Sequence, residues 1–219
     1  NAFHFRLQLL SQLIPMQTLK DDIRQRILAI AREAFIAHGV RGTSIRQVAG
    51  KAGIAVGNIY TYFSSKDELF CEVLRPLLHA LNRYIQSHND ERNLSINIFT
   101  EQEIQEGHIM SIKTLVQKFR AELRLLLFQA EGTSLAGYKA KIIQHQAEIA
   151  QEYLLLMKAR YPHINTNISP FLLHIACSTW MNLFSELVEH DEYSEQEIDC
   201  ALRQYAAYST AGWKALMNP

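Results

Sequence analysis

Apolar positions recur at intervals of three and four along most of the chain, which is the spacing of amphipathic helices. Strand-like alternation is nearly absent, so the pattern predicts an all-α fold. A polar stretch at residues 88–107 should be a loop with at most a short helix. On either side of it we expect helices over about 18–38, 44–52, 56–63, 65–87, 108–131, 138–160, 169–189 and 194–216.

Residues that favour helix ends mark several of these boundaries. Gly39 and Gly53 suit the stops of the first two helices, since glycine readily adopts the left-handed backbone found there. Pro76 lies inside the fourth helix and should kink it or split it. Three pairs with capping-box spacing predict helix starts: Thr18 with Asp21, Ser44 with Gln47, and Ser65 with Glu68.

Composition narrows the class of protein. The 219 residues have no net formal charge, and the three cysteines have neither metal-like nor disulfide-like spacing. No apolar run approaches the ~18 residues of a membrane helix. We therefore expect a protein of the reducing cytoplasm that has no membrane partner. Residues 1–15 end at Pro15, just before Met16, and we interpret them as a leader or a non-native remnant.

The charges are unevenly spread along the chain. Residues 23–66 hold seven basic side chains and one acidic side chain, a balance of +6. Residues 76–219 hold 12 basic and 16 acidic side chains. A basic helical head is typical of a nucleic-acid binder, although a solvated charged helix face gives a similar count.

Two short helices joined by the turn Gly53-Ile54-Ala55, with a longer helix before them, predict a helix-turn-helix. On a helical wheel, Ile59 and Phe63 of the second short helix share the face that packs on the other two helices. The opposite side presents small and polar groups that can reach base edges or phosphates: Gly57, Asn58 and Thr61, flanked by Tyr60 and Tyr62. The alternative is a surface helix whose tyrosines only cover the core.

These residues carry a resemblance to a known family. The stretch GTSIRQVAGKAGIAVGNIYTYFSSKDELF, residues 42–70, is similar to the N-terminal DNA-binding region of TetR-type transcriptional regulators. The resemblance covers about residues 25–78, a quarter of the chain. It implies a DNA-binding head at residues 16–66 and a larger helical domain for effector binding and dimerisation at residues 67–219.

The resemblance also implies a role for each matching position. Arg46 would reach a base, most plausibly a guanine by a bidentate contact. The side chains expected in the major groove are those of Gly57, Asn58 and Thr61. The side chains expected on backbone phosphates are those of Thr43 or Ser44, Tyr60, Tyr62 and Lys66. Two positions depart from the family pattern, because Ala55 cannot cap the following helix as serine would and Val56 stands where a basic residue is common.

For the larger domain, the resemblance implies a homodimer that binds a pseudo-palindromic double-stranded operator. The interface would lie on helices 169–189 and 194–216, whose apolar residues cover more than one face: Phe171, Leu172, Ile175, Trp180, Leu183, Phe184, Leu187, Ile198, Ala201, Leu202, Tyr205, Tyr208 and Trp213. It implies no cofactor but a small-molecule effector. Polar or aromatic candidates on the central helices are His108, Met110, Phe119, Arg124, Phe128, His145, Tyr153, His174 and Met181. We predict effector contacts for these residues except Met110 and Met181.

Other classes of function remain open at this point. A DNA-binding regulator controlled by a protein partner, with no small-molecule effector, would have the same head. A helical enzyme or metal-binding bundle with an incidental helix-turn-helix is the other alternative. The sequence offers no nucleophile–base pair and no phosphate loop, so no catalytic residue is predicted. His145 and Glu148 share a helix face, but no second such pair lies on another helix, so no metal site is predicted.

Overall fold

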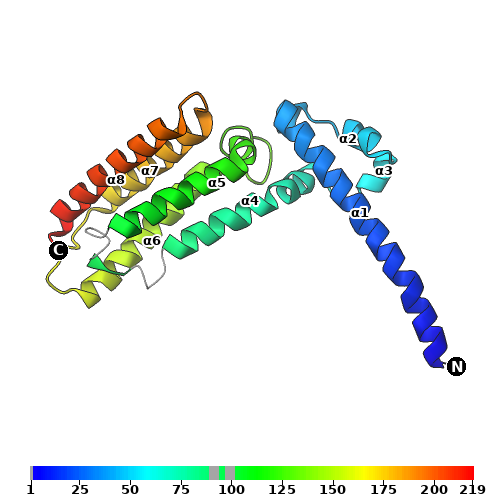
Figure 1. Cartoon of the computed structure of the whole chain (residues 1–219), viewed down its shortest axis with the longest axis horizontal. Helices are drawn as coiled ribbons and strands as arrows, with labels where there is room; N and C mark the ends of the chain where they lie inside the picture. Colours follow the sequence, from blue (N-terminus) through cyan, green and yellow to red (C-terminus); the bar gives the residue numbers. More distant parts are fainter. Residues whose placement is uncertain (1, 89–93, 97–101) are drawn as a thin grey trace. The chain divides into compact units, whose positions relative to one another are not determined.

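The computed structural model describes residues 2–88, 94–96 and 102–219, of which residues 2–19, 87–88 and 102–103 are described by their backbone alone. The all-α prediction is confirmed over this part of the chain, which contains no strand. Helices α6, α7 and α8 begin and end within one residue of the predicted limits. The eight α-helices of the described residues (Figure 1) are α1 (Ala2–Gly42), α2 (Ile45–Ala52), α3 (Val56–Ile59), α4 (Lys66–His88), α5 (Gln102–Phe128), α6 (Tyr138–Arg160), α7 (Pro170–Glu189) and α8 (Glu195–Met217).

The chain divides into two compact units. Unit 1 comprises the residues up to Pro76 together with Gln129–Leu135, and unit 2 comprises Leu77–Phe128 and Ala136–Pro219. Helix α4 therefore begins in unit 1 and continues into unit 2. Unit 1 extends beyond the expected head at residues 16–66, because the first half of α4 packs on α1.

The core of unit 1 holds α1, α2, α3 and the start of α4 together. Phe35 of α1 and Phe70 of α4 meet edge to face, with ring centroids 5.2 Å apart. Burying a large apolar side chain contributes roughly 1.5–3 kcal/mol. The four-residue helix α3 is therefore held mainly by the burial of Ile59 and of Phe63, just beyond its end. Other buried side chains in this unit include Ile27, Ala31, Val48, Ala49, Ala52, Leu69 and Leu74.

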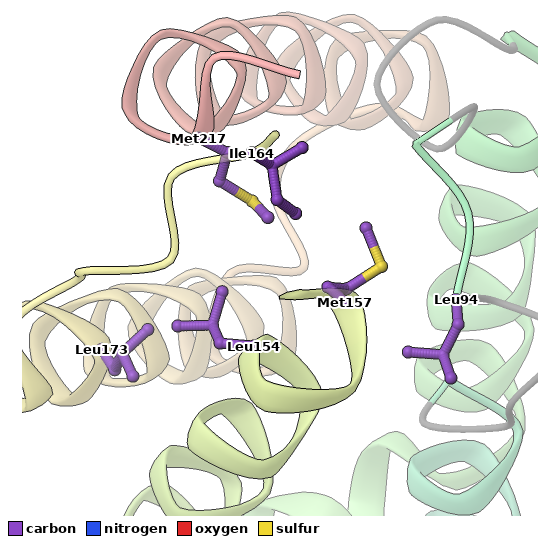
Figure 2. Packing of buried hydrophobic residues seen from close by; sticks show 6 residues of the cluster. All are labelled: Leu94, Leu154, Met157, Ile164, Leu173 and Met217. Carbon is purple, nitrogen blue, oxygen red and sulfur yellow. The ribbon is translucent and has the colours of Figure 1, made fainter. Parts of the chain in front are cut away.

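In unit 2, helix α7 packs against α5 and α6, and α8 packs against α5. Figure 2 shows one cluster of this core, to which α6, α7, the segment between them and the end of α8 all contribute: Leu94, Leu154, Met157, Ile164, Leu173 and Met217. The backbone N–H of Asn165 donates to the carbonyl of Met217 at 2.7 Å, and its side-chain amide donates to the carbonyl of Leu216 at 2.9 Å. The α6–α7 connection is thus fixed to the end of α8.

One predicted helix start is wrong, and at another the predicted side-chain cap does not form. Helix α1 begins at Ala2 and passes through Thr18, because helix-forming leucines and glutamines precede that residue. Ser44 occupies the N-cap of α2, but its side chain caps no backbone N–H. The predicted stop at Gly39 is confirmed as a break in the helical backbone, with φ 66° and ψ 177°.

Two predictions about the middle of the chain also need correction. Helix α4 runs unbroken from Lys66 to His88, so Pro76 does not split it. Helix α5 begins at Gln102, within the predicted loop, because polar residues such as the half-buried Gln105 are also good helix formers. The rest of the predicted loop lies largely outside the described residues.

Helix α7 is the one helix of the described chain that is long and apolar enough to cross a membrane. Counting consecutive apolar residues missed it, because polar residues such as Thr179 and Asn182 interrupt the runs. Within unit 2, α7 buries Leu173, Phe184 and Val188. Only 28% of this apolar span is buried, so its position in the core accounts for part of its apolar character.

Candidate nucleic-acid interface and internal cavity

The turn between α2 and α3 depends on Gly53. Its backbone is left-handed, with φ 68° and ψ 31°. The N–H groups of Gly53 and Ile54 donate to the carbonyls of Gly50 and Ala49 at 3.2 and 3.1 Å, which closes the end of α2. A residue with a Cβ would be strained at this φ, so the predicted helix-ending glycine is confirmed.

Helix α3 is shorter than the predicted helix over residues 56–63. Only Val56–Ile59 are α-helical, and the N–H groups of Tyr62 and Phe63 then both donate to the carbonyl of Ile59 at 2.9 Å in a turn. Ala55 has the extended backbone of an N-cap but no side chain to accept a hydrogen bond. The missing cap gives a physical reason for the short helix.

One side of α3 and its turn is open to solvent. Ile59 and Phe63 are each only 1% exposed, and the predicted inward face is therefore confirmed. A Cβ added at Gly57 would meet nothing within 4 Å, so packing inside the protein does not require glycine there. The exposed residues, which we name the outer strip, are Gly57, Asn58, Tyr60 and Thr61, and Tyr62 beside them is half-buried.

The structure distinguishes the two candidates for a phosphate contact at the start of α2. Thr43 is buried, and its hydroxyl donates to the carbonyls of Ala34 at 3.0 Å and Gly39 at 2.8 Å. Ser44 is exposed, as is Arg46 two residues later. Thr43 therefore holds α1 against the start of α2, and the hydroxyl available to an external partner is that of Ser44.

Lys66 is the first residue of α4, next to a capped helix start. The N–H of Glu68 donates to Ser65 Oγ at 3.0 Å, and the Glu68 carboxylate accepts a bond from the N–H of Ser64 at 2.6 Å. The predicted cap at Ser65 is confirmed, although Glu68 reaches back to Ser64 instead of Ser65. Hydrogen bonds from the side chain and backbone of Ser64 lower the pKa of Glu68 below its usual value.

Arg24 connects the three elements behind the outer strip. Its guanidinium pairs with Glu72 of α4 and lies over the ring of Phe63, 5.1 Å from the centroid. Glu72 pairs also with Arg75. Arg24 is thus a positioning residue within unit 1, whereas Arg46 is exposed.

Residues 129–135 lie on the start of α4 within unit 1. The backbone N–H of Ser134 donates to Asp67 Oδ1 at 2.9 Å, and its hydroxyl lies 3.3 Å from the thiol of Cys71. An added Cβ at Gly39 would lie 3.0 Å from the side chain of Gln129. The short connection between α5 and α6 is therefore packed against the same residues that begin α4.

Unit 2 contains a cavity of about 240 Å³ between α4, α6, α7 and α8. Aliphatic side chains, among them Leu81, Ile142 and Met181, form much of its wall. The aromatic part of the wall consists of Tyr84, Trp180, Phe184 and Trp213, and the polar part includes Gln146 and Cys177.

Three of these aromatic rings are nearly parallel. The rings of Tyr84 and Trp180 have centroids 6.0 Å apart and planes 15° apart. Those of Trp180 and Phe184 have centroids 5.7 Å apart and planes 6° apart. We name this group the ring ladder. Burial raises the pKa of Tyr84 far above its usual range and also raises that of Cys177, so both groups are neutral at physiological pH.

None of the seven side chains expected to contact an effector lines this cavity, whereas Met181, which the prediction left out, does. Arg124 donates to the carbonyls of Val188 at 3.1 Å and Glu189 at 2.8 Å, and pairs with Asp191. It thus caps the end of α7. Phe119 is buried at a break in the helical backbone of α5, with φ −128° and ψ 21°.

The other five candidates are distributed over unit 2. Phe128, His145 and His174 are exposed. His108 is half-buried, and burial lowers its pKa. Tyr153 packs on the cluster of Figure 2.

Sequence reasoning had placed three of the aromatic cavity residues, Trp180, Phe184 and Trp213, at the dimer interface. The available signal was that Trp180 and Phe184 stand four residues apart on one helix face, and that the only two tryptophans of the chain lie on neighbouring predicted helices.

Comparison with known proteins supports the interpretation of unit 1. Residues 27–73 match the family described as "Bacterial regulatory proteins, tetR family". The HTH-type transcriptional regulator SrpR of Pseudomonas putida is 39% identical over 61 residues, which cover 28% of this chain and 29% of SrpR. The matched part of the chain thus spans less than a third of the length of that relative.

Two solved structures extend the likeness to the whole fold. NalD, the secondary repressor of the MexAB-OprM multidrug efflux pump in Pseudomonas aeruginosa, aligns with a TM-score of 0.58 over 90% of this chain and 98% of its own, at 20% identity. The ketosteroid transcriptional regulator KstR2 of Mycobacterium tuberculosis aligns with a TM-score of 0.55 over 86% of this chain and 93% of its own, also at 20% identity. At this identity the likeness shows a shared all-α fold.

Proposed function

From the premise that the chain belongs, through residues 27–73, to the tetR family of bacterial regulatory proteins, we propose that the protein is a sequence-specific DNA-binding transcriptional regulator. We propose further that it is a cytoplasmic repressor that a small-molecule effector releases from its operator. The observation that carries the proposal is the outer strip, because its exposed polar groups stand on a short helix whose other side is buried.

In the proposed complex, α3 enters the major groove. Asn58 and Thr61 can hydrogen-bond base edges, and Gly57 leaves room for the helix to approach the duplex. The hydroxyl of Thr61 donates to the carbonyl of Asn58 at 2.7 Å, so its oxygen remains able to accept a bond from a base. Arg46 would read a guanine. The groups proposed to bind phosphates are Ser44, Tyr60, Tyr62 and Lys66.

We propose that the protein acts as a homodimer through α7 and α8. Phe171 is 71% exposed and Tyr208 is 75% exposed, while Ile175 and Leu216 also face solvent. Exposed apolar side chains on neighbouring helices favour a protein partner. A two-fold dimer would place two copies of α3 in half-sites about 34–36 Å apart, which fits a pseudo-palindromic operator.

The cavity is the proposed effector site. Its wall includes Leu81 and Tyr84 of α4, the helix that begins at Lys66 in unit 1. An effector that binds one position of α4 more tightly than another would shift the fraction of protein able to hold both half-sites. This differential affinity is what release from the operator requires.

Selection of binding sites from random DNA tests the proposed function. We expect one pseudo-palindromic sequence to be enriched. Arg46→Ala should weaken its binding by about 1–3 kcal/mol and relax the preference at one base in each half-site. Lys66→Ala should weaken binding to all sequences and reduce the salt dependence by about one unit per subunit.

Arg83→Ala serves as the control, because Arg83 is an exposed cation on α4 but lies in unit 2. It should bind the selected operator as the parent protein does. If no sequence were enriched, or if both head variants bound the operator like the parent protein, the proposed interface would be wrong.

A further inference from the structure

The cavity of unit 2 has a wall that selects by charge. Among the described residues that line it, none is aspartate, glutamate, lysine, arginine or histidine. Its polar groups are neutral ones, among them the amide of Gln146, the phenol of Tyr84 and the indoles of Trp180 and Trp213. An ion placed against this wall would lose part of its hydration without gaining a counter-ion, which is unfavourable.

The ring ladder selects by shape. The planes of Tyr84 and Trp180 are 15° apart and those of Trp180 and Phe184 are 6° apart, at centroid distances of 6.0 and 5.7 Å. Aromatic rings prefer offset stacking or edge-to-face contact, so a flat ring that lies parallel to the ladder extends an arrangement already present. A saturated ring of the same size has no flat face to stack.

The volume sets the size of the ligand. An engineered apolar cavity of about 150 Å³ in another protein stays dry and binds benzene. The 240 Å³ cavity is larger by roughly the space of a second fused ring. It is smaller than the range of about 300–1,000 Å³ that is typical of sites for drug-sized ligands.

Gln146 gives the cavity a point of polar recognition. It lies on α6, one turn before Ala150, which also lines the cavity. Its amide can donate to one ligand oxygen or accept from one ligand hydroxyl. Purely apolar compounds would leave this group unmatched when they displace water.

From these observations we infer that the effector of this protein is an uncharged, flat, two-ring aromatic compound that carries one hydroxyl or carbonyl oxygen. Its rings lie parallel to the ring ladder, and its oxygen bonds to the amide of Gln146. This inference names the class of ligand that binds the cavity. That the ligand acts as an effector rests on the proposed function.

Calorimetric titration of the full chain without DNA tests the ligand class. The probes share one ring system and differ in one property each: naphthalene, β-naphthol, decahydro-β-naphthol, β-naphthoate and β-naphthylmethylammonium. We expect β-naphthol to bind most tightly. The carboxylate and the ammonium compound should bind at least about 100-fold more weakly, and the saturated alcohol about 2- to 10-fold more weakly.

Matched variants then assign binding to the cavity. Gln146→Leu should weaken β-naphthol by about 2- to 10-fold and leave naphthalene unchanged or tighter. Gln151→Leu makes the same substitution at an exposed position of the same helix and should change neither affinity. Trp180→Leu should abolish the preference for the flat ring, and Phe184→Leu repeats this test if Trp180→Leu proves unstable in thermal unfolding.

Three results would overturn the inference: no neutral probe binds, a charged probe binds as tightly as β-naphthol, or Gln146→Leu and Gln151→Leu behave alike. Because the titration contains no DNA, its failure is separate from failure of the operator selection. If the operator is bound but the probes are not, only the ligand class is wrong. If β-naphthol binds as expected but no operator is found, the DNA-binding function is wrong.

Discussion

At the scale of single residues, Thr43 and Ser44 stand next to each other but have different roles. Thr43→Val removes a buried hydroxyl whose one proton is shared between the carbonyls of Ala34 and Gly39 in α1. It should lower the free energy of unfolding by about 1–3 kcal/mol. Ser44→Ala removes a hydroxyl that caps nothing, so stability should change little while operator affinity falls. Urea denaturation and DNA titration of both variants measure the two effects.

The opposite pattern would show that this assignment is reversed. If Ser44→Ala unfolded more easily while Thr43→Val kept its stability and lost DNA affinity, Thr43 would be the phosphate contact. Ser65→Ala is the comparison variant within unit 1, because loss of the α4 cap should lower the free energy of unfolding by about 1 kcal/mol. Ser95 lies in unit 2 and does not serve this purpose.

Single residues also explain why the cavity could not be predicted. The inward face of α3 and its turn followed from periodicity, because Ile59 and Phe63, with Val56 close by, are the apolar residues at helical spacing. Helix α7 is apolar on more than one side, so periodicity does not tell which side faces the cavity and which faces a partner. Trp180 and Phe171 were therefore assigned to one interface, although Trp180 lines the cavity and Phe171 is exposed.

At the scale of elements, the start of α4 should respond to pH through Glu68. Its pKa is lower in the folded protein than in the unfolded chain, because Ser64 donates to its carboxylate. Glu68 therefore stabilises the fold above its unfolded pKa, and this contribution is lost as the pH falls through the folded pKa. The stability difference between the parent protein and Glu68→Gln should shrink as the pH falls below about 4.5.

Urea denaturation at a series of pH values measures this difference. Glu33→Gln changes an exposed glutamate of α1 and is the matched control. A difference between the parent protein and Glu68→Gln that stays constant across the acid range would contradict a role for the ionised carboxylate in the cap.

Helix boundaries were predictable where a local signal opposes continuation of the helix. Gly53 forces a left-handed turn, and Pro170 suits the first turn of α7, so the ends there were placed closely. The start of α5 was missed because no capping residue, proline or glycine stands immediately before Gln102 to mark a helix boundary. Likewise, the apolar spacing over residues 56–63 fits a helix of four residues as well as one of eight. Only Ala55, which cannot cap the helix, indicated that α3 is weak.

At the scale of the whole molecule, the proposed dimer can be tested on two equally exposed apolar side chains. Phe171 on α7 is 71% exposed, and Leu155 on α6 is 72% exposed. Phe171→Asp should convert the dimer to a monomer in sedimentation velocity, because it places a charge in the proposed interface. Leu155→Asp should leave the dimer intact. If Leu155→Asp alone gave the monomer, the interface would lie on α6 and not on α7 and α8.

Communication between the two units should depend on Pro76, the last residue of α4 that belongs to unit 1. Proline lacks an N–H, so the carbonyl of Glu72 has no helical donor at that position and α4 can bend there at lower cost. Pro76→Ala restores the bond and should stiffen the helix.

We expect β-naphthol, or whichever compound of its panel binds most tightly, to bind the Pro76→Ala variant without DNA as tightly as it binds the parent protein. The ratio of operator affinities without and with that compound, typically about 5- to 150-fold for coupled sites, should fall towards one. His79→Ala, an exposed substitution on the same helix, should leave the ratio unchanged, and an unchanged ratio in Pro76→Ala as well would exclude Pro76 as the pivot.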